Sequence, residues 1–234
     1  MRRGKLIVID GPDYVGKKTQ TDFLYRSLKA EGLKVKTIRF PFYETPTGRI
    51  VGQCLLGKKR EWYQGDVAWF GDPERIPPEV ASHFYAADRK MHSPWMNQML
   101  DSGTHLISDR YYQANMGHQG AKIKDRLDRQ WFFQYIKDLE LGLNKIPRED
   151  LCILLTLPIE IAMKLASERV EEADRIENNW DHLRAARECY GHMWDHFSRH
   201  QNWYRVECSW DGEMRPREEI NEEIRDLVRK ELRI

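Results

Sequence analysis

The sequence predicts an α/β domain in which five parallel strands form a sheet covered by helices on both faces. Three observations support this fold class: five short apolar runs alternate with stretches of helical character, a glycine-rich turn follows the first run, and an Asp-Arg pair follows the third. Short apolar strands separated by helices are typical of parallel sheets that are buried on both faces. Such sheets bind ligands at the carboxyl ends of their strands.

The strands and the last helix can be placed from the apolar pattern. Pro216 stands near the start of the last segment, acidic residues follow it, and Arg229 and Lys230 lie near its end. This order is typical of a helix whose charges match its dipole, and an apolar stripe predicts that the helix docks on the sheet. The five strands are expected at residues 6–9, 35–40, 105–108, 151–157 and 204–208.

Length and composition favour one domain over residues 1–234. With 234 residues, of which 41% are hydrophobic, the chain can bury a full core. Its 38 Lys and Arg residues nearly balance 37 Asp and Glu residues, so the net charge predicts neither a nucleic acid nor a membrane as a partner. The four cysteines form no C-x-x-C pair, and we find no signal peptide or long apolar run, which predicts reduced thiols in a cytoplasmic enzyme.

Residues 57–78 depart from the alternating pattern. The segment reads GKKREWYQGDVAWFGDPERIPP, has neither a helix nor a strand period, and contains several Gly, Pro and aromatic residues. A stretch of this length without a period predicts a long loop or excursion between two helices.

Residues 4–19, GKLIVIDGPDYVGKKT, have the order of a phosphate-binding loop. An apolar strand runs into Gly11, and Gly16 and Lys17 follow at the spacing of such loops. The glycines let the backbone curl so that N–H groups and the next helix point at a phosphate, which the lysine also reaches. A purely structural turn is the alternative. The residues expected to hold the nucleotide are Gly11, Asp13, Tyr14, Val15, Gly16, Lys17, Lys18 and Thr19.

Lys18 occupies the position where such a loop usually carries Ser or Thr, whose hydroxyl binds Mg²⁺. A protonated lysine cannot ligate a metal, and the nearest hydroxyl belongs to Thr19. Two interpretations remain open. Either Lys18 supplies the charge that Mg²⁺ otherwise brings, or it points outward while Asp109 and water hold the ion.

Asp109 and Arg110 directly follow the third strand, so the sheet is expected to bring them near the phosphate-binding loop. A carboxylate there can hold Mg²⁺ directly or through water, and a planar guanidinium can clamp a phosphate during its transfer. We therefore expect Asp109 to be the metal-binding residue, and Asp109, Arg110 and Lys17 to take part in catalysis. A surface ion pair of little energetic value is the alternative.

Two further patterns have both a functional and a structural interpretation. Tyr85 and Arg89 lie four residues apart, on one helical face, which suits a nucleobase and its phosphate, although such aromatic residues more often belong to a core. The charged segment 169–177, which contains Arg169 and Arg175, suits a lid that covers phosphates and excludes water. Most charge runs, however, are solvated faces.

The histidines at 192, 196 and 200 repeat at the spacing of one helical face. Such spacing invites a metal-site interpretation. Because no carboxylate or cysteine partner stands in an evident motif, a polar helix face is the preferred interpretation.

Together, these segments resemble the thymidylate kinases, nucleoside monophosphate kinases that pass the terminal phosphate of ATP to dTMP. The resemblance runs nearly end to end and implies a three-layer P-loop kinase fold with a short lid at about residues 168–179. It rests on IDGPDYVGKKTQ for the phosphate loop, FPFYETPTG for the family's F-P-x-R-x-T-x-x-G segment, FYAADR for the base-stacking helix, SDRYYQANMGHQGAK for the DRY region and DRIE for the lid.

The resemblance implies ATP and Mg²⁺ as cofactors, dTMP as acceptor and a homodimer. Lys17 would meet the ATP phosphates, and Asp109 would organise Mg²⁺. Arg175, and less firmly Arg169, would contribute from the lid.

At the acceptor, the resemblance implies that Asp13 accepts a hydrogen bond from the sugar 3′-hydroxyl, while Arg89 and Arg110 hold the monophosphate. Tyr85 would stack on the base, and Gln119 would border the nucleoside. The full set implied at the acceptor is Asp13, Phe40, Pro41, Tyr43, Tyr85, Arg89, Arg110, Tyr111 and Gln119.

The chain also departs from the family pattern at Lys18, at Tyr43 where an arginine would grip the acceptor phosphate, at His118 where Tyr is usual, and at the long segment 57–78. Tyr43 offers a neutral hydrogen bond in place of a charged clamp, which lowers the binding free energy for the acceptor phosphate by about 1 to 2 kcal/mol. Two alternatives to dTMP phosphorylation therefore stay open. They are a kinase for another deoxynucleoside monophosphate and a nucleotide-binding protein whose turnover is impaired at Lys18.

Overall fold

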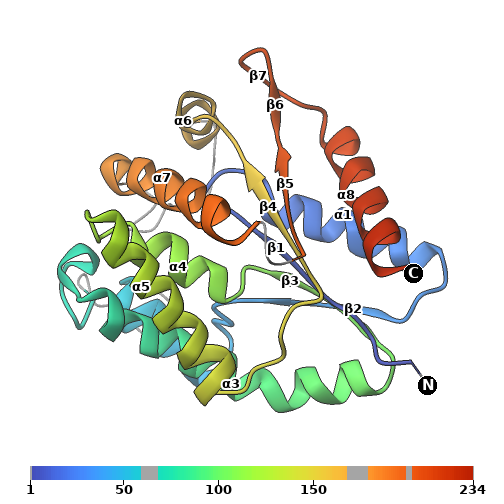
Figure 1. Cartoon of the computed structure of the whole chain (residues 1–234), viewed down its shortest axis with the longest axis horizontal. Helices are drawn as coiled ribbons and strands as arrows, with labels where there is room; N and C mark the ends of the chain where they lie inside the picture. Colours follow the sequence, from blue (N-terminus) through green and yellow to red (C-terminus); the bar gives the residue numbers. More distant parts are fainter. Residues whose placement is uncertain (1, 59–67, 168–178, 199–201, 234) are drawn as a thin grey trace.

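The computed structural model describes residues 2–58, 68–167, 179–198 and 202–233, and its centre is a five-stranded parallel sheet in the order β2-β3-β1-β4-β5 (Figure 1). Every neighbouring pair of its strands is parallel. The predicted fold class is confirmed, and each predicted strand end lies within one residue of the observed end. The strands are β1 (Leu6–Asp10), β2 (Val35–Arg39), β3 (His105–Asp109), β4 (Leu151–Thr156) and β5 (Trp203–Glu207).

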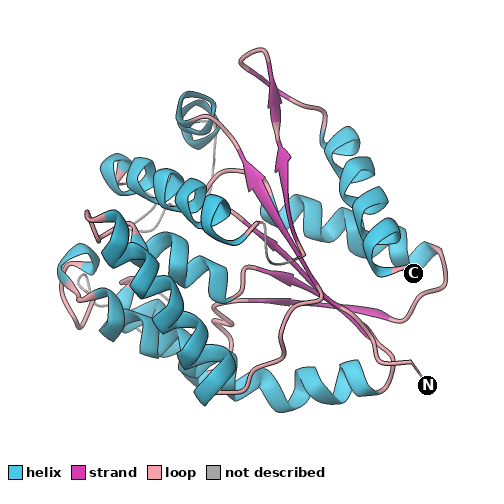
Figure 2. Cartoon of the chain, viewed as in Figure 1, coloured by secondary structure: helices cyan, strands magenta, loops and turns pink. Residues whose placement is uncertain are grey.

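Helices cover both faces of the sheet, as Figures 1 and 2 show. Helices α1 (Lys17–Ala30) and α8 (Arg217–Leu232) pack on one face, against alternate strand side chains such as Ile7 and Val206. The opposite face carries α3 (Pro78–Asp101), α4 (Tyr112–Gly120), α5 (Arg126–Lys137) and α7 (Trp180–Phe197).

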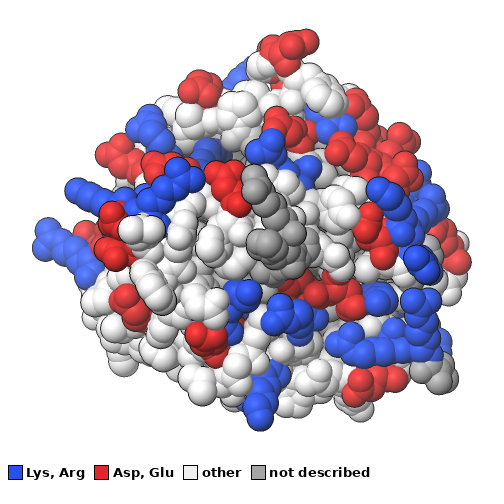
Figure 3. Space-filling model, in the orientation of Figure 1, with Lys and Arg blue, Asp and Glu red and all other residues white. Residues whose placement is uncertain are grey.

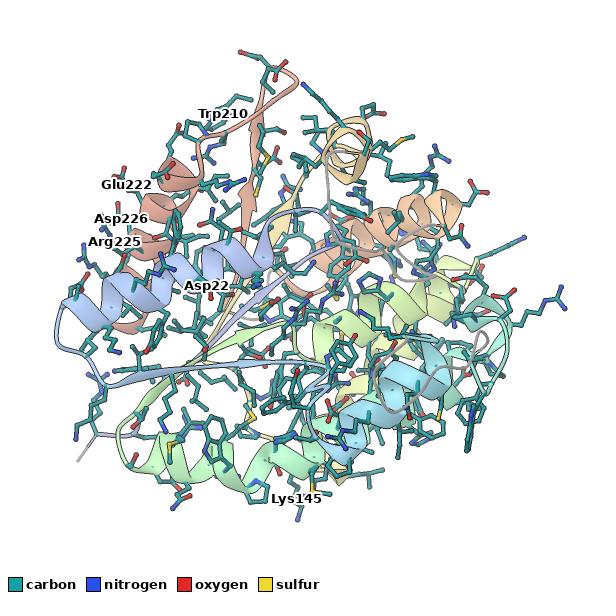
Figure 4. The ribbon with its side chains drawn as sticks, turned by 180° about the vertical axis from the view of Figure 1, so that it is seen from behind. Asp22, Lys145, Trp210, Glu222, Arg225 and Asp226 are labelled. Carbon is teal, nitrogen blue, oxygen red and sulfur yellow. The ribbon has the colours of Figure 1, made fainter. Side chains whose placement is uncertain are left out.

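Figure 4 shows the first of these faces, with α1 and α8 side by side and exposed Glu222 and Asp226 on the outer side of α8. The predicted C-terminal docking helix is thus confirmed. Its acidic first turn and its basic last turn, with Arg229 and Lys230, match the helix dipole.

Shorter elements connect this frame. Strands β6 and β7 pair as an antiparallel hairpin whose central residues, Asp211 and Gly212, both have positive φ. The Asp-Gly dipeptide is typical of such a turn, although the sequence analysis did not predict this hairpin. The described residues between 57 and 77 contain one short helical turn, η2. The connecting elements are α2 (Pro46–Ile50), η1 (Val51–Leu55), η2 (Pro73–Arg75), η3 (Asp138–Leu143), α6 (Ile159–Ser167), β6 (Ser209–Trp210) and β7 (Glu213–Met214).

The surface mixes charges of both signs. On the face of Figure 3, Lys and Arg side chains are interspersed with Asp and Glu. All four cysteines carry free thiols, and those at 152, 189 and 208 are buried. Within the described residues, no helix is long and apolar enough to cross a membrane.

Two glycines allow α7 to approach α4 closely. A Cβ atom at Gly117 would lie 2.2 Å from the ring of Tyr190, and one at Gly120 would lie 2.9 Å from the Cys189 sulfur. The Tyr190 ring cannot move freely, because its hydroxyl donates to Asp10 Oδ1 at 2.8 Å. The α4–α7 contact therefore requires glycine at position 117.

We predict that Gly117→Ala lowers the free energy of unfolding by about 1–3 kcal/mol, since the added methyl overpacks a fixed aromatic ring. Gly191→Ala in the exposed face of α7 is the matched control, because a Cβ there meets nothing within 4 Å. The control gains helix propensity without a clash and is expected to raise stability by up to about 1 kcal/mol. Urea unfolding measures the free energy of unfolding of both variants, and equal values would contradict the packing argument.

Candidate active site

The register of the sheet brings the phosphate-binding loop and the Asp-Arg pair together. Ile9 of β1 and Arg39 of β2 both lie beside Asp109 of β3, so the carboxyl ends of three strands meet there. The loop that follows Asp10 and the turn that holds Arg110 leave the sheet at this edge. The sequence analysis predicted this neighbourhood from strand order alone.

The loop has the backbone that a phosphate cradle needs. Gly11 has φ +143°, and a Cβ atom there would lie 2.4 Å from the Leu155 carbonyl oxygen, so only glycine fits. Tyr14 and Gly16 also have positive φ, at 67° and 84°. The chain then enters α1 at Lys17, so the positive end of the helix dipole lies at the loop.

Lys17 is folded over this loop. Its Nζ donates to the carbonyl oxygens of Gly11 and Pro12 at 2.9 and 2.6 Å. Burial, and secondarily the charge of Arg110, lowers the pKa of Lys17 to about 8, although nearby aspartates oppose this shift. The lysine is thus a buried cation that is available to a polyphosphate.

Asp13 and Arg110 form the central ion pair of the site. The Arg110 Nη2 donates to Asp13 Oδ1, and Lys17 Nζ lies 3.7 Å from the same oxygen. Burial alone would raise the pKa of Asp13, but Arg110 and Lys17 hold it well below the usual value. Arg110 has φ +67°, a left-handed conformation that costs energy in a non-glycine residue. Such strain is typical of functional positions.

Asp109 has the oxygen that a cation would need. Its Oδ2 lies 3.4 Å from Nε of Arg39, whereas Oδ1 is buried without a hydrogen-bond partner among the described residues. A buried anionic oxygen of this kind calls for water or an ion, and carboxylate oxygen is the ligand type that Mg²⁺ prefers. The site therefore fits Mg²⁺. Exposed Lys18 lines the same cavity as Asp109 and Asp22.

A second cavity lies beside the loop, and Asp13 forms part of its wall. Eight of the nine residues expected at the acceptor line it, and Tyr111 is the exception. It shares Arg39, Pro41 and Tyr43 with the cavity that contains Asp109. Its walls are formed by Asp13, Arg39, Phe40, Pro41, Tyr43, Leu56, Lys58, Tyr85, Arg89, Arg110, Ala114, Asn115, His118 and Gln119.

Two expected acceptor residues need correction. Tyr111 is fully buried, its hydroxyl donates to the Pro147 carbonyl at 2.9 Å, and its ring packs on Phe40, so it belongs to the core. Arg89 is 2% exposed, and both its Nε and Nη2 donate to Glu140 Oε1, at 2.9 and 2.5 Å. Because its charge is already paired there, the geometry assigns Arg89 to the cavity wall and not to a phosphate clamp.

Sequence reasoning missed Asp10, which holds the site together. It is fully buried, and burial raises its pKa despite Lys17 and Arg110 nearby. Its Oδ1 accepts hydrogen bonds from the Gly11 N–H and the Tyr190 hydroxyl, and its Oδ2 accepts one from the Tyr111 N–H. A charged residue that ends an otherwise apolar strand was the available signal.

Two arginines were also missed. Arg187 of α7 donates from Nη2 to the Asp13 carbonyl at 2.8 Å and from Nε to the Leu157 carbonyl at 3.2 Å, which fixes the loop to α7. Arg39 lines both cavities with a half-exposed side chain. A cation that ends a strand next to the phosphate loop was the signal for Arg39, whereas no local pattern marks Arg187.

Some expectations lie outside the described residues. Arg169, Arg175 and residues 168–178 of the expected lid belong to this group, as does His200. His192 is buried, with its ring on Phe133 and its Nε2 3.3 Å from Gln130 Nε2, so the preferred interpretation as a polar helix face is wrong at this position. Among the residues that the structure describes, no cluster of His, Cys, Asp or Glu could hold a metal ion.

Comparison with known proteins agrees with this geometry. The chain is 32% identical to a probable thymidylate kinase of Thermococcus gammatolerans over 188 residues, which cover 76% of this chain and 81% of that protein. It is 28% identical to the thymidylate kinase of Homo sapiens over 236 residues, which cover 99% and 93% of the two chains. The structure of thymidylate kinase from Candida albicans shares the fold, with a TM-score of 0.71 at 21% identity over 97% of this chain and 92% of that one.

The family model for thymidylate kinase matches residues 9–207, which include the phosphate loop, the Asp109–Arg110 turn and the walls of the second cavity. The chain therefore belongs to the thymidylate kinase family of ATP-dependent nucleoside monophosphate kinases.

Proposed function

We propose that this protein transfers the terminal phosphate of ATP to dTMP, giving ADP and dTDP, within one domain over residues 1–234. The observation that carries the proposal is the meeting of a phosphate loop, a buried Asp13–Arg110 pair and a cavity of nucleoside-binding character at one edge of the sheet. Family membership supports both the reaction and the acceptor.

The loop side binds the ATP phosphates. Backbone N–H groups between Gly11 and Thr19 and the start of α1 supply fixed partial positive charge, and Lys17 supplies a full charge. Lys18 adds a second cation from the neighbouring cavity. Mg²⁺ at Asp109 would neutralise phosphate charge during transfer, and the unpartnered Oδ1 is the atom that would hold it.

The cavity side binds the acceptor. Tyr85 stacks on the base, Gln119 borders the nucleoside, and Asp13 accepts a hydrogen bond from the sugar 3′-hydroxyl. Arg110 binds the monophosphate, and Arg39 contributes the charge that Tyr43 lacks at the position of the family's arginine.

Transfer needs positioning and charge, and no side chain has to act as a nucleophile. An oxygen of the acceptor phosphate attacks the γ-phosphorus, and the bond from that phosphorus to the bridging oxygen of ADP breaks. Lys17, Arg110 and Arg39 stabilise the charge on the oxygens of the transferred phosphoryl group in the transition state. Arg175 of the lid region is assigned the same role.

A homodimer in the cytoplasm completes the proposal. The outer face of α3 presents Ala87, exposed Met91 and Pro94 beside Leu139, which is an apolar surface suited to a second copy of the chain. The free thiols favour a reducing compartment. Light scattering in solution checks the dimer, and a monomeric mass would exclude it.

The decisive experiment measures ADP formation from ATP and Mg²⁺ with dTMP, dUMP, dCMP, dGMP and dAMP supplied one at a time. Turnover is expected to be fastest with dTMP and to be lost in Asp109→Asn, which removes the anionic oxygen but retains the shape. A preference for another monophosphate would change the assigned acceptor. Nucleotide binding without turnover would instead identify a nucleotide-binding protein whose turnover is impaired by Lys18. Restored turnover in Lys18→Ser would support this hypothesis.

The affinity for an uncleavable ATP analogue is expected to fall as pH rises through about 8, because the phosphates bind cationic Lys17 and its pKa in the free protein is about 8. The limiting slope is about tenfold per pH unit. Lys17→Arg keeps its charge at all these pH values, so its affinity is expected to lose this slope. Calorimetry measures the affinity of the wild type and of Lys17→Arg for the analogue as a function of pH. Parallel pH profiles would rule out Lys17 as the titrating group.

Arg39→Ala is expected to raise the KM for dTMP by roughly three- to tenfold and to change the KM for ATP little, since a half-exposed charged contact is worth about 1 kcal/mol. The matched control is Arg205→Ala, which removes an exposed arginine from edge strand β5, paired with Glu207. The double variant Arg39→Ala/Tyr43→Arg is expected to recover the KM. An unchanged KM for dTMP in Arg39→Ala would refute the assignment.

A further inference from the structure

A row of three side chains starts beside Arg110 with His118, a wall residue of the acceptor cavity, and continues to His182 and Glu74. Arg110 Nη1 lies 3.0 Å from His118 Nε2, and His118 Nδ1 lies 3.5 Å from His182 Nε2. At the far end, His182 Nδ1 lies 2.8 Å from Glu74 Oε1. The row joins α4 to α7 and ends on the short turn η2, within the segment 57–78 that departs from the family pattern.

The contacts fix where each proton lies. A guanidinium nitrogen only donates, so His118 Nε2 must accept, and a neutral His118 then carries its proton on Nδ1. That proton points to His182 Nε2, which must also accept. The remaining proton of His182 is therefore on Nδ1, beside a carboxylate oxygen of Glu74, where a lone pair would be repelled.

Both imidazoles are shielded from water. His118 is 8% exposed, and the His182 side chain is 1% exposed. Burial, helped by Arg110, His182 and Lys17, holds the pKa of His118 well below its usual value, although Asp13 opposes the shift. The Tyr190 ring closes the other side of His118, with ring centroids 5.7 Å apart.

The carboxylate at the end of the row is held in place. Lys122 Nζ donates to the carbonyl oxygens of Pro73 and Ile76, at 2.6 and 3.1 Å, on either side of Glu74. Asp72 accepts a hydrogen bond from the Glu74 N–H at 3.0 Å. Burial would raise the pKa of Glu74, but the contact with His182 lowers it, so the group is an anion at neutral pH.

We propose that Glu74, His182 and His118 are positioning residues that orient Arg110 for the acceptor phosphate, an inference that rests on the proposed function. With Glu74 present, one arrangement of protons satisfies the contacts with Arg110, between the two histidines and with Glu74, and it aims an acceptor atom of His118 at Arg110. Without Glu74, only Arg110 opposes the reversed tautomers, and the far end of the row no longer does. The His118 Nε2–H then faces an Arg110 N–H, and the arginine is driven from its place beside Asp13.

The first test examines the tautomers in the wild-type protein. In protein labelled with ¹⁵N-histidine, ring-nitrogen NMR distinguishes the two neutral tautomers and the cation. The signals of His118 and His182, among the eight histidines of the chain, are assigned by His118→Gln and His182→Gln. Both residues are expected as the neutral Nδ1–H tautomer at pH 7. Finding either as Nε2–H or as the cation would overturn the proposal, whichever monophosphate the enzyme uses.

The second test measures what the row does for the acceptor. Glu74→Ala is expected to mix the tautomers and to raise the KM for the monophosphate by about fivefold, the scale of one hydrogen bond, with the KM for ATP within twofold. Glu74→Gln keeps an acceptor oxygen and is expected to stay close to wild type. Exposed Glu79→Ala, five residues on, controls for the loss of a carboxylate.

The outcomes separate this role from a structural one and from the proposed function. Equal rises of both KM values in Glu74→Ala, or unchanged tautomers with unchanged kinetics, would overturn the proposal. If the enzyme prefers another monophosphate, the KM comparison is made with that compound and the NMR result stands. If Glu74→Ala does not fold, the wild-type tautomers and Glu74→Gln still decide.

Discussion

A single buried carboxylate, that of Asp10, holds three parts of this molecule in register. Its oxygens accept from the first residue of the phosphate loop, from the residue after Arg110, and from Tyr190 of α7. Each partner comes from a different stretch of chain, so the loop, the β3 turn and α7 are fixed relative to one another. A buried carboxylate that loses a hydrogen bond destabilises the folded protein. Loss of any one partner is therefore expected to disturb the positions of the other two. The close α4–α7 contact at Gly117 follows from the same constraint, since it leaves room for the ring whose hydroxyl reaches Asp10.

Around this anchor, charges alternate in sign at short range. Lys17 Nζ lies 3.7 Å from Asp13 Oδ1, Arg110 lies against Asp13, and Arg39 lies against Asp109. The pKa directions follow from this order: burial raises the pKa of Asp10, while adjacent cations keep Asp13 ionised. Buried charges that are already paired need little reorganisation when a charged ligand arrives, which is the condition for electrostatic stabilisation of phosphoryl transfer. Asp109 Oδ1 is a buried oxygen left over from this pairing.

Local patterns predicted the parts of the fold that depend on local physics. The five strands followed from apolar runs, the loop from glycine spacing, and α8 from its stripe and charge order, and all of these are present. What the sequence could not reveal are pairings between distant positions. Tyr190 and Asp10 are 180 residues apart, and Arg89 and Glu140 are 51 apart. Arg89 was therefore assigned to a phosphate when a buried glutamate already pairs with it. Tyr111 was misplaced for a related reason, because a residue beside a functional arginine can turn its side chain into the core.

The departures from the family pattern become understandable when charge is treated as a property of the cavity. Tyr43 is neutral where an arginine is usual, yet the Lys58 ammonium lies 4.7 Å from the centre of its ring, and Arg39 lines the same walls. An acceptor phosphate responds to the summed field of nearby cations and not to the chain position that supplies them. Hydrogen-bond geometry is less transferable, because a neutral tyrosine cannot replace a bidentate clamp. Arg110 is one of the arginines in these walls, and its Nη1 lies 3.0 Å from His118 Nε2. The cavity therefore lacks an arginine at position 43 but has positive charge from Arg39, Lys58 and Arg110 in its walls.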